Sequence, residues 1–116
     1  PFDQRGIPDV SWYASNGKPV NWDKPDGTIV CWLAKPSPAT DPNGFGRDIL
    51  ILMNGTPETK TFTMPESVRG TRWRLFLDTQ APSPNDVFPD MDGPELPANR
   101  QVPMLYRSCV VYVSDA

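Results

Sequence analysis

Histidine is absent from this sequence, so any acid–base catalysis would have to use carboxylates. Its absence removes the commonest general base, the Ser-His and Cys-His nucleophile pairs and histidine-based zinc sites. A glycosidase needs two carboxyl groups, one protonated and one ionised, at a fixed separation across the sugar bond. The acidic residues instead gather in loops and turns, where carboxylates are usually solvated: Asp23, Asp26, Asp41, Asp86, Asp90, Asp92 and Glu95. We therefore expect no catalytic residue within this chain.

Two acidic segments place oxygen-bearing side chains at spacings that a calcium ion could use. The first is D-P-N-G-F-G-R-D at 41–48, which lacks the closing bidentate glutamate of an EF-hand loop. The second is N-D-V-F-P-D-M-D-G-P-E at 85–95, and acidic loops interrupted by proline are common without a cation. No glycine-rich phosphate loop follows a strand and opens a helix. We expect no metal ion and no cofactor.

The four tryptophans could bind a ligand without taking part in catalysis, because an exposed indole ring can stack on a sugar. Trp32 and Trp73 lie inside strand-like runs and are expected in the core. Trp12 and Trp22 flank an Asn-Gly turn, where an exposed pair would form a platform for a sugar. A small domain needs large side chains to fill its interior, which favours packing of both in the core.

These side chains have to be positioned by a single domain, since 116 residues are too few to bury two cores. The 15 prolines, 8 glycines and net charge of -3 indicate a turn-rich globular domain. Basic residues form no stripe, which argues against nucleic acid as a partner. No apolar run approaches the roughly 20 residues of a membrane span, so no membrane partner is expected.

The first residues carry neither a methionine nor a signal-peptide pattern. We expect a fragment of a longer protein, although a processed secreted protein would begin in the same way. Cys31 and Cys109 lie far apart, each in an apolar strand-like run, where thiols are usually buried and inert. The sequence leaves undecided whether the two form a disulfide. Two cysteines do not make a disulfide framework, which favours a reducing cytoplasm.

Short runs of β-branched, aromatic and aliphatic residues predict strands. They are T-I-V-C-W-L-A at 28–34, D-I-L-I-L-M-N at 48–54, K-T-F-T-M-P at 60–65, R-W-R-L-F-L-D at 72–78 and S-C-V-V-Y-V-S at 108–114. Polar and apolar residues alternate over 61–64 and 72–74, which predicts burial of one face, as in antiparallel sheets. The runs 49–53 and 109–113 are apolar on both faces, so we expect them to be central and covered on both sides.

Turn and loop residues complete the predicted architecture. S-N-G-K at 15–18 and N-G-T-P-E-T at 54–59 predict compact links, while P-E-S-V-R at 65–69 has room for one helical turn at most. Two proline-rich loops, 36–47 and 81–99, are the expected places for surface function. The pattern predicts an all-β fold: a single antiparallel β-sandwich of two sheets, with seven or eight short strands in Greek-key order.

The order of these segments resembles the C-terminal β-domain of isoamylase-type glycogen debranching enzymes in the alpha-amylase superfamily. The matching series is D-V-S-W, N-W-D-K-P-D-G-T-I-V-C-W-L, D-I-L-I-L-M-N-G-T-P-E-T-K-T-F-T-M-P, W-R-L-F-L-D-T and Y-R-S-C-V-V-Y-V, from Asp9 to Val113. Each motif alone is a strand with a turn residue, and the specificity lies in their order and spacing. The chain departs from the family in the longer 36–47 loop and in N-G-T-P-E-T, where the family often carries histidines.

The resemblance implies a parent enzyme that hydrolyses α-1,6 branch linkages of glycogen or related α-glucans by a retaining, two-carboxylate mechanism. Its catalytic residues would lie in an upstream TIM barrel, with residues 1–8 of this chain as the linker. The chain itself, residues 1–116, would be a non-catalytic domain that packs on the barrel and stabilises it. Contacts with the barrel or with glucan are expected from Trp12, Trp22, Asp23, Phe45 and Phe88.

Two other functions stay open. The domain could by itself be an α-glucan-binding module that uses exposed aromatic residues. It could also be a structural β-sandwich of a secreted protein, which would fit the missing methionine and the two cysteines.

Overall fold

The computed structural model describes residues 10–24, 26–35, 46–90 and 92–114. These residues form an all-β fold of seven strands and one short 3₁₀ helix, η1. The elements are β1 (Val10–Tyr13), β2 (Thr28–Leu33), β3 (Ile49–Asn54), β4 (Lys60–Thr63), η1 (Glu66–Gly70), β5 (Trp73–Asp78), β6 (Gln101–Met104) and β7 (Ser108–Ser114). The five strands predicted from apolar runs are all present, and η1 occupies the predicted helical turn.

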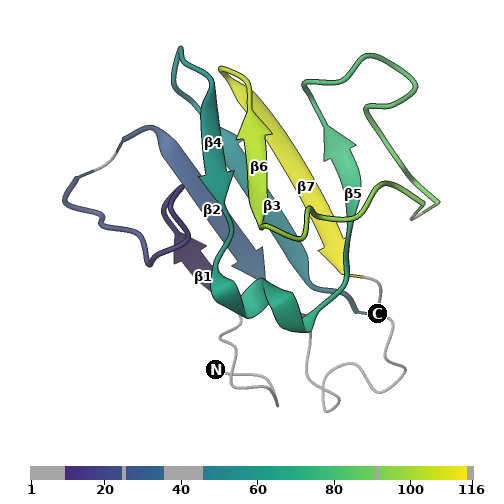
Figure 1. Cartoon of the computed structure of the whole chain (residues 1–116), viewed down its shortest axis with the longest axis horizontal. Coiled ribbons are helices and arrows are strands. Elements are labelled where there is room, and N and C mark those ends of the chain that lie inside the picture. The colour runs from purple at the N-terminus through teal and green to yellow at the C-terminus, as the bar shows by residue number, and fades with distance from the viewer. Residues whose placement is uncertain (1–9, 25, 36–45, 91, 115–116) are drawn as a thin grey trace.

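Five strands form one antiparallel sheet in the order β1-β2-β3-β7-β5 (Figure 1). The strand latest in sequence, β7, therefore lies between β3 and β5. The Asn16-Gly17 turn is present as predicted: Gly17 has a φ of 83°, and the Ala14 amide donates to the Lys18 carbonyl at 2.8 Å. Glycine adopts this left-handed conformation without steric cost.

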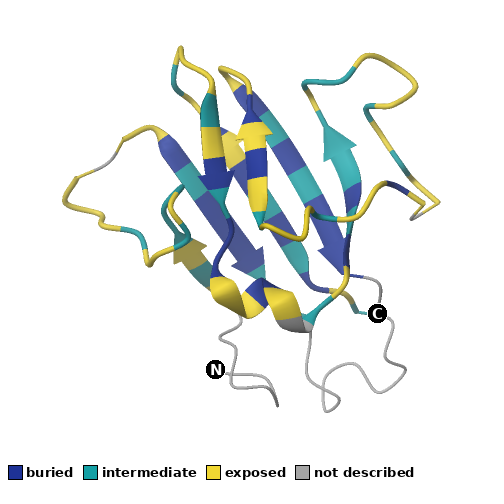
Figure 2. Ribbon diagram, in the orientation of Figure 1, coloured by how far each residue is buried: buried dark blue, intermediate teal, exposed yellow. Residues whose placement is uncertain are grey.

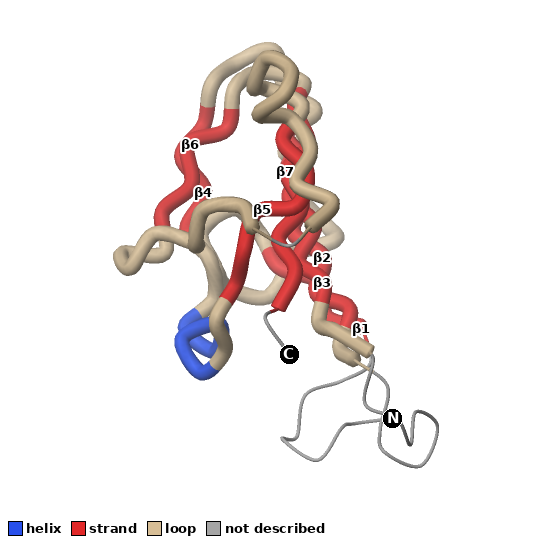
Figure 3. Tube along the Cα trace, turned by 90° about the vertical axis from the view of Figure 1, so that its right-hand side faces the viewer, coloured by secondary structure: helices blue, strands red, loops and turns tan. Residues whose placement is uncertain are grey.

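The second sheet contains only β4 and β6, and it lies over one face of the five-stranded sheet in a β-sandwich-like arrangement (Figure 3). One cluster of buried side chains fills the space between the layers: Val30, Trp32, Leu50, Leu52, Phe62, Met64, Val68, Trp73, Leu75, Val102, Met104, Val110 and Tyr112. Trp32 and Trp73 contact each other edge to face, with ring centroids 5.4 Å apart. The prediction that these two tryptophans fill the core is confirmed.

Strands β3 and β7 occupy inner positions in the sheet, as predicted, but the face away from the core is covered only in part: Val113 is buried there and Met53 is not. Leu50, Leu52 and Val110 face the core and are almost fully buried. On the opposite face Met53 is 39% exposed, and Ile51 is only half-buried. The prediction of cover on both sides is therefore wrong at Met53, because the second sheet has two strands and lies on the other side.

The 81–99 loop is more regular than its proline content predicts. Its backbone follows the edge of β5: the Phe88 amide donates to the Phe76 carbonyl at 2.8 Å, and the Leu96 amide donates to the Trp73 carbonyl at 3.0 Å. Pairing of this kind uses backbone N–H and C=O groups, so it cannot be predicted from the pattern of side chains. Most of the other long loop, 36–47, lies outside the described residues.

Candidate functional site

The face of the five-stranded sheet that points away from the core is almost wholly apolar; we call it the outer face. Strand register places its side chains in rows across the sheet. One row contains Trp12, Cys31, Ile51, Val111 and Leu77, the next contains Val10, Leu33, Ile49, Val113 and Arg74, and a third contains Ile29, Met53 and Cys109. Arg74 is the single charged residue in these three rows.

The outer surface of the second sheet has a different character. Thr61 pairs with Pro103 and Thr63 pairs with Gln101 on that side. Buried and exposed residues alternate along β6, as Figure 2 shows, and its exposed members are Gln101 and Pro103. The two outward surfaces therefore differ: one is the polar surface that water favours, and the other is an apolar surface that monomeric proteins usually keep small.

Trp12 and Trp22 lie at the β1 edge of the outer face and not in the core. The Trp12 side chain belongs to the outer-face row, and Trp22 follows the turn after it. They are 42% and 65% exposed, and their rings meet edge to face with centroids 5.9 Å apart. The expectation that both pack in the core is wrong, since the core is already filled by Trp32, Trp73 and Phe62.

The turn that holds Trp22 is fixed by local hydrogen bonds. The Asp23 amide donates to the Asn21 side-chain oxygen at 3.0 Å, and the Lys24 amide donates to the Asn21 carbonyl at 3.2 Å. Asp23 is exposed beside Trp22. The structure therefore places three of the expected contact residues, Trp12, Trp22 and Asp23, at one edge of the molecule.

Of the two phenylalanines expected at the same site, the structure describes Phe88, which lies beside β5 and not at the β1 edge. Phe88 is half-buried and packs against the core cluster from the 81–99 loop, because its backbone is paired with β5. Its ring is therefore only partly exposed, and its contact with the barrel or with glucan stays a prediction. Phe45 lies outside the described residues, as does the expected linker 1–8.

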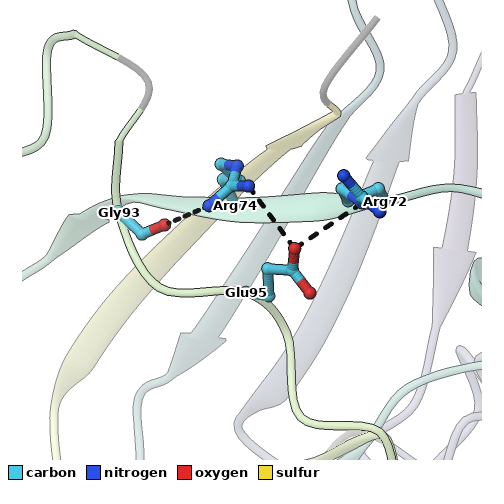
Figure 4. A network of polar contacts seen from close by, with 4 residues as sticks. All are labelled: Arg72, Arg74, Gly93 and Glu95. Carbon is cyan, nitrogen blue, oxygen red and sulfur yellow. Dashed lines mark hydrogen bonds and ion pairs between the residues drawn. The ribbon is translucent and has the colours of Figure 1, made fainter.

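A group of arginine and glutamate side chains at the opposite, β5, edge was not singled out by the sequence pattern. Glu95 Oε1 lies 3.5 Å from Arg72 Nε and 3.4 Å from Arg74 Nη2, and Arg74 Nη1 donates to the Gly93 carbonyl at 3.3 Å (Figure 4). In the sequence, the arginine-rich segment R-G-T-R-W-R at 69–74 could have indicated this group. The segment alone does not identify its ion-pair partner Glu95, which lies about twenty residues later in the chain and returns to the same edge.

The two thiols are free. Cys31 pairs with Ile51 and Cys109 with Met53, so β3 separates them. Two strand spacings amount to about 9–10 Å, beyond the roughly 7 Å limit between Cα atoms for a disulfide. Burial raises the pKa of both thiols, which makes them poor nucleophiles at neutral pH.

Acid–base and metal chemistry have little basis in the described residues. The Thr28 hydroxyl donates to Asp26 Oδ1 at 2.5 Å, and this bond holds the pKa of Asp26 below its ordinary value, as suits a turn carboxylate and not a general acid. Within those residues no group of three or more Cys, Asp or Glu side chains could hold a metal ion. Nor does the described part of the chain contain a helix long and apolar enough to cross a membrane.

Comparison with models of protein families gives no match for this chain, and comparison with curated proteins gives none either.

Proposed function

We propose that the chain is the non-catalytic C-terminal β-domain, a Greek-key β-sandwich, of a cytoplasmic isoamylase-type glycogen debranching enzyme. In this role it packs on the catalytic barrel of the same polypeptide and stabilises it. The barrel hydrolyses α-1,6 branch linkages of glycogen or related α-glucans, and this domain contributes no catalytic residue. The proposal combines the resemblance in motif order with the character of the outer face.

The observation that carries the proposal is the difference between the two outward surfaces. Exposing an apolar sheet face of three rows to water is unfavourable, because burying apolar surface stabilises by roughly 25 cal/mol per Å². Met53 and Val10 remain 39% and 44% exposed, so a partner surface can still cover them. A large catalytic domain in the same polypeptide provides such a surface at high effective concentration.

The motif residues that carry the resemblance have structural roles in this fold. Asn54, which ends the leucine-rich strand, is 1% exposed. Its side-chain amide donates to the carbonyls of Glu58, Met104 and Leu105 at 2.9, 3.2 and 3.1 Å. One side chain thereby joins the end of β3 to the turn before β4 and to the end of β6. An asparagine at this point supports the two-sheet arrangement that the resemblance implies.

The test uses the full polypeptide that carries this domain and compares Met53→Lys with Thr61→Lys. Both add one positive charge to an exposed strand position, the first on the outer face and the second on the polar surface. We expect α-1,6 hydrolysis of glycogen in the native polypeptide. Met53→Lys is expected to lower the temperature of half-inactivation by about 5 °C, because a lysine ammonium is costly to bury at an interface.

Thr61→Lys is the matched control and is expected to leave that temperature unchanged within about 1 °C. A polypeptide without α-1,6-glucosidase activity would contradict the proposed enzyme. Equal effects of the two lysines would contradict the outer face as the contact surface.

The exposed tryptophan pair favours a second candidate function, contact with α-glucan at the β1 edge. The turn at Asn21 fixes the backbone around Trp22, and the ring of Trp22 rests against that of Trp12, which reduces the conformational entropy lost when a sugar stacks on it. Titration with maltoheptaose, followed by the indole NMR signals, is expected to give saturable shifts for Trp12 and Trp22. Trp22→Ala should abolish them, whereas Tyr106→Ala, which removes an aromatic ring 60% exposed elsewhere, should not. No shift at millimolar sugar excludes this candidate.

A further inference from the structure

Asn16, Asn21 and Asn54 lie in or beside turns and make the same local hydrogen bond. In each, the side-chain Oδ1 accepts from the backbone amide two residues later at 3.0 Å. The next residue differs: it is glycine after Asn16 and Asn54, and tryptophan after Asn21. Glycine has no side chain to shield its backbone nitrogen, so this nitrogen is open to reaction with the preceding asparagine side chain. A further Asn-Gly pair, at 43–44, lies outside the described residues.

The surroundings of the two asparagines that precede glycine are opposite. Asn16 is exposed at the tip of the hairpin turn after β1, so water reaches its amide group. Asn54 is 1% exposed, and its Nδ2 donates to the three carbonyl oxygens that link β3 to β4 and β6. Loss of the amide nitrogen would break all three of these bonds at Asn54, and breaking buried hydrogen bonds is unfavourable. The fold therefore protects Asn54 and leaves Asn16 open to water.

We propose that Asn16 is a modification site, at which spontaneous deamidation converts the asparagine to aspartate or isoaspartate, and that the fold protects Asn54 from the same reaction. The backbone nitrogen of Gly17 attacks Asn16 Cγ, a bond forms between these two atoms, and the Cγ–Nδ2 bond breaks. The proton of the Gly17 amide passes through water to the departing nitrogen, which leaves as ammonia. Water then opens the five-membered succinimide ring at one of its two carbonyl carbons. The reaction consumes only water, and the proposal does not depend on the proposed function.

The attacking nitrogen has to be released from its own hydrogen bond before it reacts. The Gly17 amide donates to the Ala14 carbonyl at 3.1 Å, within a turn at the surface. Local opening of such a turn leaves the core contacts in place, and turns of this kind open at low free energy. The Gly55 amide donates to the Gly27 carbonyl at 2.8 Å, so release of that nitrogen separates the turn after β3 from the start of β2.

Isoaspartate at position 16 changes how the turn lies against β4. The isoaspartate backbone runs through the former side chain and is longer by one methylene group. The turn has little room for it, because a Cβ atom on Gly17 would lie 2.9 Å from the Thr63 carbonyl oxygen. The Thr63 amide also donates to the Ser15 carbonyl at 2.7 Å. We therefore expect the isoaspartate form to loosen the contact between the hairpin turn and the end of β4.

The first experiment incubates the native chain in neutral buffer for several weeks and follows each asparagine by tandem mass spectrometry. Deamidation replaces an amide NH₂ by OH, which raises the fragment mass, and protein isoaspartyl methyltransferase labels the isoaspartate product. In the native chain the reaction at Asn16 is expected to be at least about tenfold faster than at Asn54 or Asn21. In guanidinium chloride, which removes the fold, Asn54 should react within about threefold of the Asn16 rate, and Asn21 should stay slow.

The second experiment compares the native chain with Asn16→Gln after the same incubation. Glutamine closes the corresponding ring far more slowly, so this variant is the unreactive control. Hydrogen exchange at the Thr63 amide is expected to be at least about fivefold faster in the isoaspartate fraction of the native chain, and unchanged within about twofold in Asn16→Gln.

Equal rates at Asn16 and Asn54 in the folded chain would overturn the proposal, because the fold would then give no protection. A rate at Asn21 equal to that at Asn16 would overturn the role of glycine. Unchanged Thr63 exchange in the isoaspartate fraction would overturn the loosened contact with β4.

Discussion

At the scale of single residues, two buried polar side chains fix the ends of β3. Asp48 precedes the strand and is fully buried; its carboxylate accepts from the Trp32 indole at 3.3 Å and from the Lys35 amide at 2.7 Å. Asn54 closes the other end. The sequence pattern placed both at strand ends, where polar residues usually meet water. Their burial could not be predicted, because their partners come from β2, β6 and the turn after β3.

Tyr112 makes the stability of the fold sensitive to alkaline pH. Burial, together with the nearby charge of Asp78, raises the pKa of Tyr112 to about 12, against about 10 in the unfolded chain. Between these values only the unfolded state releases the proton, so stability is full below pH 10 and falls as pH rises. By pH 11 the native chain should lose about 1 kcal/mol more than Tyr112→Phe.

Urea unfolding of both chains at pH 9 and pH 11 measures this loss, and the shared lysines cancel in the comparison. The same pH dependence in the native chain and in Tyr112→Phe would contradict the assignment to Tyr112.

At the scale of elements, the edge of β5 is covered by its own following loop. The Leu75 amide donates to the Pro94 carbonyl at 2.8 Å, and the Phe88 and Leu96 amides continue the pairing. A β-bulge between Leu75 and Leu77 marks the stretch of β5 where these contacts occur. Periodicity predicted β5 correctly, and proline spacing predicted a loop after it. The docking of that loop depends on backbone groups and on one glycine.

Gly93 permits this close approach. A Cβ atom at this position would lie 2.0 Å from the Leu75 carbonyl oxygen and 3.0 Å from the Phe88 ring. Gly93→Ala should therefore push the loop away from β5 and destabilise the fold by about 1–3 kcal/mol. Hydrogen exchange at the Leu75 and Leu96 amides should accelerate more than exchange at β3 amides.

Gly55→Ala serves as the control, because the nearest atom to its Cβ is the Gly27 carbonyl oxygen at 3.2 Å, and it should cost less. Unchanged stability and exchange in Gly93→Ala would contradict the close approach.

At the scale of the whole molecule, sequence patterns predicted the strands and the two tryptophans of the core, but not how the layers cover each other. Residues 49–53 and 109–113 are apolar on both faces, a pattern that gives no information on which covering element belongs to this chain. Whether Trp12 and Trp22 lie in the core depends in the same way on which elements cover each face of the sheet. The pocket lined by η1, the start of β5 and residues 95–100 joins segments that are separate in sequence. The pairing of the 93–96 segment with β5, together with the contacts of Arg100 with Met64 and Glu66, brings them together.

The position of β7 in the middle of the sheet has a consequence for synthesis. β3 and β5 are made first, yet each needs residues 108–114 as its hydrogen-bonding neighbour. While the ribosome is still adding β6, the nascent chain carries two unpaired strand edges, one of them bearing the apolar run Ile49–Met53. Unpaired edges of this kind can join other chains. Native pairing therefore has to wait for release of the segment that contains β7, and until then protection by a chaperone would have most effect on β3.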